Sequence, residues 1–321
     1  MSAPPFRVSP YVTDLLCPHC GTSYSCDNRF TCPRCGDDGI LDVRYDYEAA
    51  GAALRAALPS RPFDHFRYRE LLPISPDHRL PHLQIGWTPV YDVHRLAHEL
   101  GVRRMLLKDD GRNPTNSFKD RASSIGVLKA EEYGFDTIAC ASTGNAASSL
   151  AGLSAAVGLR SYIFVPERAP APKIAQLLIF GATVIRIRGT YEQAFDLCRE
   201  ACAAFGWYNR NSGTNPYLVE GKKTAGLEIA EQCRTHLPDW VAVSVGDGCT
   251  IGGIGKGLRE MHRIGLIDRV PRLLGVQAQG ARPLLDAFLS GAELVPTPTD
   301  TIADSIAVGT PRRTAAIKLS S

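Results

Sequence analysis

Three segments rich in glycine or hydroxyl side chains hold the residues of this sequence that are best suited to chemistry. The first spans residues 109–121 and contains Lys119. Ser117 suits a helix N-cap, with Asp120 three positions on as a variant of the capping box, so Lys119 is expected in the first helical turn. A lysine there faces the positive end of the helix dipole, which lowers its pKa and favours an amine that acts as nucleophile or Schiff-base partner. A solvated surface lysine is the alternative.

The second segment covers residues 141–149 and places Ser142, Thr143 and Gly144 directly before a predicted helix. Backbone N–H groups at such a helix start are free to bind a carboxylate or a phosphate. An ordinary Ser/Thr helix cap would have the same composition.

The third segment, residues 246–257, carries six glycines between a predicted strand and a predicted helix. Glycines at this density allow the backbone to wrap an oxyanion. A Walker A loop would need glycine at Thr250 and serine or threonine at Gly257, and the dinucleotide fingerprint begun at Gly246 would need glycine at Ile251. A mononucleotide-like or cofactor phosphate therefore remains as the ligand of this loop.

Cysteine spacing near the N-terminus predicts a metal site. Two Cys-x-x-Cys pairs, each followed by glycine, supply four thiolates: Cys17, Cys20, Cys32 and Cys35. This is the ligand set of a structural zinc ribbon, and a segment of about 35 residues needs a metal because it cannot bury enough apolar surface. Cys26 and His19 are left over as bystanders. Free or redox-active thiols are the alternative.

The elements that must position these segments alternate between strand and helix from Trp87 onward. Apolar, β-prone runs are predicted as strands at 105–108, 137–140, 161–165, 183–187, 240–245 and 273–276. Helices are predicted at 47–58, 117–132, 146–157, 172–180, 191–204, 223–234, 254–263 and 282–289. This order is typical of an α/β fold with a mostly parallel sheet, whose ligands lie at the carboxyl ends of strands.

Composition excludes several classes of protein. The 321 residues are 44% hydrophobic, and 36 Lys+Arg against 33 Asp+Glu give a net charge of +3, too small to favour a nucleic acid or an anionic membrane as partner. The ribbon itself has more acids than bases, so we expect a structural role and no nucleic-acid binding. Apolar runs stay below the roughly 18 residues of a membrane helix, and the first residues do not resemble a secretory signal. The expected location is the cytoplasm, with reduced cysteines.

Together these segments resemble the threonine-synthase-like branch of the fold type II pyridoxal-phosphate (PLP) enzymes, the tryptophan synthase β family. The most specific motif is Asn-Pro-Thr-x-Ser-Phe-Lys-Asp-Arg at residues 113–121. The ribbon with residues 45–47, the arm at 66–73 and Gly-Trp-Thr-Pro at 86–89 extend the likeness over nearly the whole chain. The resemblance implies two three-layer αβα domains with mostly parallel sheets, behind an N-terminal zinc ribbon.

The resemblance also implies residue roles. Lys119 matches the Schiff-base lysine, and Ser142, Thr143 and Gly144 match the loop that binds the substrate α-carboxylate. The implied cofactor contacts are Lys119, Phe118, Asn145 (to the ring O3′), Gly246, Asp247, Gly248, Cys249 and Thr250. Their implied cofactor is pyridoxal 5′-phosphate, beside a structural zinc.

Domain boundaries follow from the same likeness. We expect a zinc ribbon at 11–47, an arm and the start of the large domain at 48–103, a Schiff-base loop and small α/β domain at 104–215, and the large-domain remainder at 216–321. Family members usually continue for several tens of residues beyond this point, so the chain is expected to lack the last piece of the large domain.

Some positions depart from the threonine synthase pattern and question O-phosphohomoserine as the substrate. Asn116 stands where those enzymes usually have glycine, and Ala122-Ser123 where they usually have Gly-Met. Asp247 and Thr250 replace residues that are commonly asparagine, and Asp247 would repel a phosphate unless its carboxylate faces neighbouring N–H groups.

The expected function is therefore a PLP-dependent lyase that carries out β,γ- or β-replacement or elimination on a small amino-acid substrate, with threonine synthase (O-phosphohomoserine and water to threonine and phosphate) as the leading reading. A cysteate-synthase- or diaminopropionate-type β-replacement enzyme and a catalytically inactive PLP-fold binding protein are alternatives. A homodimer is expected by analogy alone.

Overall fold

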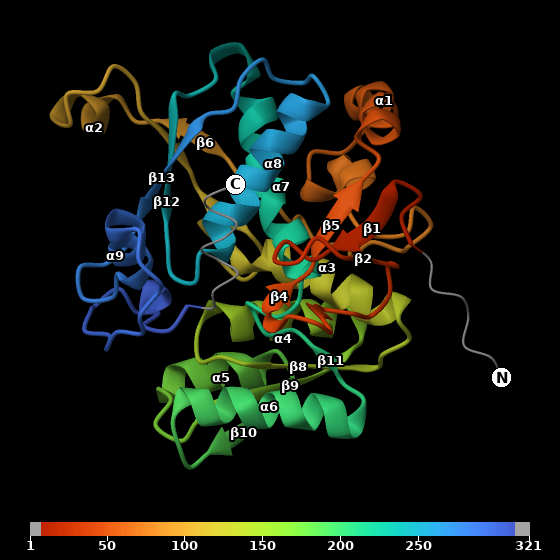
Figure 1. The fold of residues 1–321 in the computed structure, drawn as a ribbon, viewed down its shortest axis with the longest axis vertical. Helices are drawn as coiled ribbons and strands as arrows, with labels where there is room; N and C mark the ends of the chain where they lie inside the picture. Colours follow the sequence, from red (N-terminus) through yellow and green to blue (C-terminus); the bar gives the residue numbers. More distant parts are fainter. Residues whose placement is uncertain (1–7, 312–321) are drawn as a thin grey trace.

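The computed structural model describes residues 8–311. Two layered α/β parts lie one above the other in Figure 1, and the N-terminal ribbon packs beside the upper one. Residues 312–321, the end of the predicted large-domain segment, lie outside the described residues. Among the described helices, none is both long and apolar enough to cross a membrane.

The lower part is a parallel four-stranded sheet between helices. Its strands run in the order β10 (Thr183–Ile187), β9 (Arg160–Pro166), β8 (Thr137–Ala141), β11 (Tyr208–Asn209), and every pairing is parallel. Its helices are α4 (Asn145–Val157), α5 (Ala171–Ile179) and α6 (Tyr191–Phe205).

Alternate residues of β8 show how the helices cover this sheet. Ile138 and Cys140 join the apolar cluster that includes α4, whereas Ala139 and Ala141 join the cluster that includes α6. Successive side chains of a strand point to opposite faces, so α4 and α6 lie on opposite faces of the sheet. The predicted parallel α/β architecture is confirmed here.

The upper part is built around two packed helices, α7 (Tyr217–Gln232) and α8 (Cys249–Arg263). Two short sheets flank them: parallel β12 (Trp240–Ser244) with β13 (Arg272–Val276), and antiparallel β6 (Val90–Asp92) with β7 (Leu106–Lys108). The remaining helices are α1 (Tyr47–Ala57), α2 (His94–Glu99), α3 (Lys119–Glu132) and α9 (Pro283–Ser290). Short 3₁₀ helices lie at Leu58–Ser60, His65–Leu71, Asp110–Arg112, Arg234–His236 and Asp304–Ile306.

Both α7 and α8 begin earlier than predicted, at Tyr217 rather than 223 and at Cys249 rather than 254. The glycines that suggested a long loop lie instead inside the helices, where they permit close packing. A Cβ on Gly253 would lie 2.8 Å from Lys222 Cβ, and one on Gly257 would lie 2.3 Å from the Lys223 carbonyl oxygen. Most of these glycines therefore serve helix packing rather than an extended oxyanion loop.

The start of α3 also differs from the expectation. The helix begins at Lys119 with Phe118 at the N-cap position, and Ser117 Oγ accepts the Lys119 N–H at 3.1 Å. The Asp120 carboxylate does not complete a capping box, because it accepts from the Thr115 N–H at 2.7 Å and from the Thr115 hydroxyl at 2.6 Å. Lys119 nevertheless lies in the first turn, as predicted.

The N-terminal ribbon consists of five short strands. β1 (Val12–Leu16) pairs with β2 (Ser23–Tyr24) and β5 (Asp42–Tyr45), and β3 (Thr31–Cys32) pairs with β4 (Gly36–Ile40); all pairs are antiparallel. Its link to α7 and α8 is a buried ionic cluster. Lys256 Nζ lies 3.1 Å from Asp42 Oδ1 and 2.7 Å from Glu220 Oε1, and the Tyr45 hydroxyl donates to Glu220 Oε2 at 2.6 Å. The ribbon is thus attached to the helices that frame the site described below.

Candidate active site

Lys119 lies at the centre of the candidate site, half-buried at the start of α3. The charged groups that act most strongly on its pKa are Lys222, Asp247, Arg210 and Cys249, drawn from three different segments of the chain. Burial is the main cause that lowers the pKa of Lys119 to about 8, and the positive charges of Lys222 and Arg210 add to it. The helix dipole predicted a lowered pKa for Lys119, and the pKa is lowered, but burial is the main cause. An amine with a lowered pKa is suited to nucleophilic chemistry.

The loop before Lys119 is held rigidly. Asn113 Oδ1 accepts the Gly86 N–H at 2.9 Å, and Gly86 has φ +71°, a conformation that glycine adopts without strain. Two residues after Lys119, the buried Arg121 donates to Glu228 on α7 and to Asp110 in the same loop. Phe118 is half-buried with its ring 6.0 Å from the Arg121 guanidinium carbon. The residues of the 113–121 motif therefore form a hydrogen-bond network that fixes the position of Lys119.

The third glycine-rich segment begins the helix that faces Lys119. Gly248 takes φ +80° and precedes the first turn of α8, which contains Cys249 and Thr250. Asp247 Oδ1 accepts the Cys249 N–H at 3.0 Å. The carboxylate thus faces a neighbouring N–H group, the condition under which it is expected not to repel a phosphate. Burial raises the pKa of Asp247, but the charges of Lys222 and Lys119 outweigh it and hold the pKa below its usual value. Asp247 therefore carries a negative charge that neighbouring cations neutralise.

Lys222 and Arg210 are the two site residues that sequence reasoning missed. Lys222 lines a pocket with the Gly248 and Cys249 backbone and with Ile40 of the ribbon. A Cβ on Gly253 would lie 2.8 Å from Lys222 Cβ, so the glycine makes room for the lysine stem. Neither residue belongs to a recognisable motif, and both become prominent only because tertiary packing buries them.

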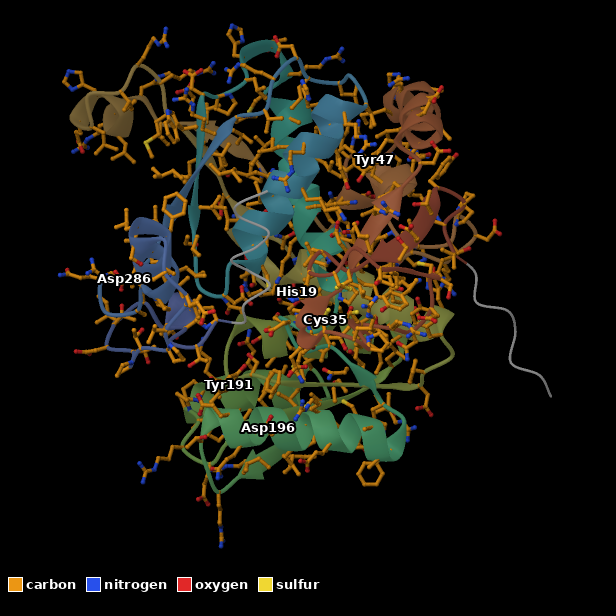
Figure 2. The ribbon with its side chains drawn as sticks, viewed as in Figure 1. His19, Cys35, Tyr47, Tyr191, Asp196 and Asp286 are labelled. Atoms are coloured by element: carbon orange, nitrogen blue, oxygen red, sulfur yellow. The ribbon has the colours of Figure 1, made fainter. Side chains whose placement is uncertain are left out.

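The second segment follows β8 on the small-domain side. Ser142, Thr143 and Gly144 are half-buried, and the Gly144 N–H donates to Ser142 Oγ at 3.1 Å. Asn145 is the exposed first residue of α4. The Tyr191 hydroxyl, at the start of α6 in the lower part of the molecule (Figure 2), donates to the Ala141 carbonyl at 3.3 Å.

The four predicted metal ligands converge in the ribbon, where Figure 2 labels Cys35. The sulfur atoms of Cys17, Cys20, Cys32 and Cys35 all lie within 4.8 Å of one another. Gly39 lies against this cluster, because a Cβ there would be 2.7 Å from the Cβ atoms of both Cys32 and Cys35. Neither Cys26 nor His19 belongs to the cluster.

The chemistry of the site follows from its charges. Three basic side chains (Lys119, Lys222 and Arg210) face one carboxylate, Asp247. Such an excess of positive charge, next to backbone N–H groups at a helix start, favours a doubly charged anion such as a phosphate group. An amine with a pKa of about 8 beside that anion is suited to carbonyl capture and to proton transfer.

Sequence comparison places the chain among known proteins. Residues 82–320 match the family described as "Pyridoxal-phosphate dependent enzyme". The threonine synthase of Methanosarcina acetivorans is 40% identical over 303 residues, which cover 92% of this chain and 73% of that protein. The threonine synthase of Methanocaldococcus jannaschii is 37% identical over 299 residues, with the same two coverages.

Solved structures share the fold. The processed form of threonine deaminase isoform 2 from Solanum lycopersicum aligns with a TM-score of 0.62 and 23% identity, covering 72% of this chain and 61% of that one. Diaminopropionate ammonia lyase from Escherichia coli aligns with a TM-score of 0.64 and 21% identity, covering 85% and 70%. With the family match and the 40% identical relative, these likenesses show that the chain belongs to the pyridoxal-phosphate dependent enzyme family of fold type II.

Proposed function

We propose that the protein is a lyase of the threonine synthase type, converting O-phosphohomoserine and water to threonine and phosphate. The observation that carries the proposal is Lys119, an amine with a pKa of about 8 facing Lys222, Arg210 and Asp247 at the start of α3. The two threonine synthases that match 92% of the chain support this reaction over others of the family.

The described residues fit pyridoxal 5′-phosphate in charge. Lys222 is buried, lines the pocket beside the Gly248 and Cys249 backbone and shares the Asp247 carboxylate with Lys119, so a phosphate there would meet an excess of positive charge. Gly246, Gly248 and Thr250 complete the phosphate loop, Asn145 is assigned to the ring oxygen, and Lys119 would hold the cofactor through its amine. When bound, the cofactor supplies an electron sink for negative charge that develops on the substrate carbons.

The chain's own residues perform the remaining tasks. Ser142, Thr143 and Gly144 would bind the substrate α-carboxylate through backbone N–H and hydroxyl groups next to the start of α4. The Lys119 amine would accept the proton from the substrate Cα and later move a proton at Cβ, for which a pKa of about 8 is well matched. Asp247, tied to the Cys249 N–H, would keep Lys222 and Lys119 oriented toward the site.

A cofactor titration tests the first part of the proposal. The purified chain is expected to bind PLP with a visible absorbance band, and Lys119→Ala is expected to abolish the band. Lys173→Ala serves as a matched control, because Lys173 is also a half-buried lysine in the first turn of a helix, α5. An unchanged band in Lys119→Ala would contradict the assignment.

A substrate comparison tests the second part. Release of inorganic phosphate is measured with O-phosphohomoserine and with O-phosphoserine, each as the sole substrate. Preference for O-phosphohomoserine with threonine as product supports the proposal. Preference for O-phosphoserine would indicate a β-replacement enzyme of the cysteate-synthase or diaminopropionate type instead.

We also propose that the four-cysteine cluster binds a structural zinc ion. The mutual proximity of Cys17, Cys20, Cys32 and Cys35 supports a tetrahedral all-thiolate site. Cys17 and Cys32 are buried and the ribbon has little apolar core of its own, so the metal would supply much of the folding free energy of this segment.

A further inference from the structure

The N-terminal ribbon contributes a wall to the pocket that contains Lys222. Ile40, the last residue of β4 and only 6% exposed, lines this pocket together with Lys222, Gly248 and Cys249. β4 lies where the upper and the lower part of the molecule meet (Figure 1). The pocket that is proposed to hold the cofactor phosphate is therefore closed on one side by the segment that is proposed to bind zinc.

Ile40 is directly connected to the four-cysteine cluster. The residue before it, Gly39, packs against two of the cysteines, because a Cβ on Gly39 would lie 2.7 Å from the Cβ atoms of both Cys32 and Cys35. Ile40 itself pairs with Thr31 of β3, the neighbour of Cys32. A metal ion held by both Cys-x-x-Cys pairs would therefore fix the β3–β4 hairpin and, with it, the side chain of Ile40.

A second connection runs through the loop that joins β2 to β3. The Asp27 carbonyl accepts the Tyr217 hydroxyl of α7 at 2.7 Å. The Tyr217 N–H in turn donates to Asn215 Oδ1 at 3.0 Å, and Asn215 lines the same pocket. Phe30 packs edge-on against Tyr208 of β11, with ring centroids 5.4 Å apart. The ribbon thus contacts both α7 and the sheet of the lower part, and it reaches the pocket by two routes.

The apolar side chain of Ile40 limits the access of water to Lys222. Lys222 is 1% exposed, and its amine shares the pocket with the start of α8. An anion is attracted more strongly to a cation where water is excluded, because the effective dielectric constant is lower. A displaced or shortened side chain at residue 40 would admit water beside Lys222 and weaken the binding of a phosphate.

We infer that the ribbon is a functional part of the cofactor site: Ile40 closes the phosphate end of the pocket, so that metal binding to the cysteine cluster and PLP binding to the pocket strengthen each other. This inference rests on the proposed function, because it takes zinc and PLP as the two ligands. Such a coupling is reciprocal, so the factor by which zinc lowers the Kd of PLP equals the factor by which PLP lowers the Kd of zinc.

Two pairs of dissociation constants measure the coupling in the unmodified chain. The Kd of PLP is determined by absorbance titration of the zinc-loaded and the zinc-free protein. The Kd of zinc is determined by competition with a chelator, with and without saturating PLP. Removal of zinc is expected to raise the Kd of PLP by about 5- to 50-fold, and PLP is expected to lower the Kd of zinc by the same factor. Equal values within each pair would overturn the inference.

Ile40→Ala tests the contact without removal of the metal. This variant should retain its zinc, measured by elemental analysis, and bind PLP about 5- to 10-fold more weakly, near the lower end of the usual range of couplings. Its Kd for pyridoxal, which lacks the phosphate, should change by less than about twofold, because the admitted water weakens only the attraction of Lys222 for an anion. Val12→Ala is the matched control, since Val12 is a half-buried apolar residue of the same ribbon but does not line the pocket.

Other results would count against the inference. Equal weakening of PLP and pyridoxal in Ile40→Ala would show that residue 40 only supports the fold, and an equal effect of Val12→Ala would show the same of the ribbon. If the zinc-free chain unfolds, Ile40→Ala alone decides. Failure of the zinc-loaded, unmodified chain to bind PLP would overturn the proposed function together with the inference, whereas binding of both ligands without coupling would overturn the inference only.

Discussion

Arg121 and Glu228 form a fully buried two-point ion pair, with Nη1–Oε1 at 2.5 Å and Nη2–Oε2 at 2.8 Å. The pair joins α3 to α7 two residues after Lys119. Burial alone would raise the pKa of Glu228, but the charge and hydrogen bonds of Arg121 outweigh burial and lower that pKa to about 2. The start of α3, which carries Lys119, is thus anchored to α7 by an ionic contact made entirely inside the protein.

Arg121→Met tests this contact. It should lower the free energy of unfolding by about 3–5 kcal/mol, because it leaves Glu228 buried with Lys108 as its one remaining ion-pair partner among residues 8–311. Urea unfolding measures the change. Arg121→Met combined with Glu228→Leu should recover part of the loss, since the fully buried Glu228 carboxylate is removed and the Asp110 carboxylate that remains is partly exposed. A single variant within about 1 kcal/mol of the parent protein would show that the pair is unimportant for stability.

The pKa of Lys119 predicts a pH profile for cofactor capture. With a pKa of about 8, half of the amine is neutral near pH 8 and about one-tenth at pH 7, and only the neutral form attacks a carbonyl. The rate of PLP capture by the cofactor-free protein should therefore rise with pH and level off above pH 8. Lys222→Met removes the nearest positive charge, so it should raise the pKa of Lys119 and move the midpoint to higher pH. A midpoint at the ordinary lysine value of 10.5 in the unmodified protein would contradict the prediction.

Removal of the metal ion should lower the stability of the N-terminal ribbon. The purified chain is expected to carry one zinc ion, and Cys35→Ser should lose it, because three thiolates hold zinc far less tightly than four. Elemental analysis gives the stoichiometry and thermal unfolding the stability, which should fall with the metal. Cys26→Ser is the matched control, since Cys26 lies in the same ribbon but outside the cluster. Equal zinc content in both variants would refute the assigned ligands.

Local sequence patterns predicted much of the fold. The strand at 183–187 was predicted with its observed bounds, and β8, β9 and β12 differ from their predictions by one residue at either end. These strands are apolar runs bounded by turn residues, and most residues of β8 and β9 are buried. The starts of α7 and α8 were missed because glycine normally indicates a loop. Here Gly221 and Gly253, which lie in the first turns that the prediction omitted, serve close contacts with Arg121 and Lys222, residues far away in the sequence.

The candidate active site could be predicted from the sequence where its residues lie in one contiguous motif. Residues 113–121 contain the lysine, its loop and the arginine that anchors it, so Lys119 could be found from sequence. Arg210 and Lys222 could not, because their significance is their burial beside Lys119 and Asp247. That property belongs to the packed molecule, since it depends on every chain segment that surrounds the two side chains.

Asn116 offers a test of backbone strain in the loop that precedes Lys119. Its φ is +55°, in the left-handed region, which glycine and asparagine tolerate far better than β-branched residues. Asn116→Gly should change the free energy of unfolding by less than about 0.5 kcal/mol, because glycine adopts a positive φ without strain. Asn116→Val should lower it by about 1–2 kcal/mol and also slow PLP capture, because a shifted loop moves Lys119. Arg112→Val is the matched control, since Arg112 is exposed in the same loop and does not have positive φ. Urea unfolding and the capture rate give both quantities, and equal effects of the two valine substitutions would show that strain at Asn116 has no role.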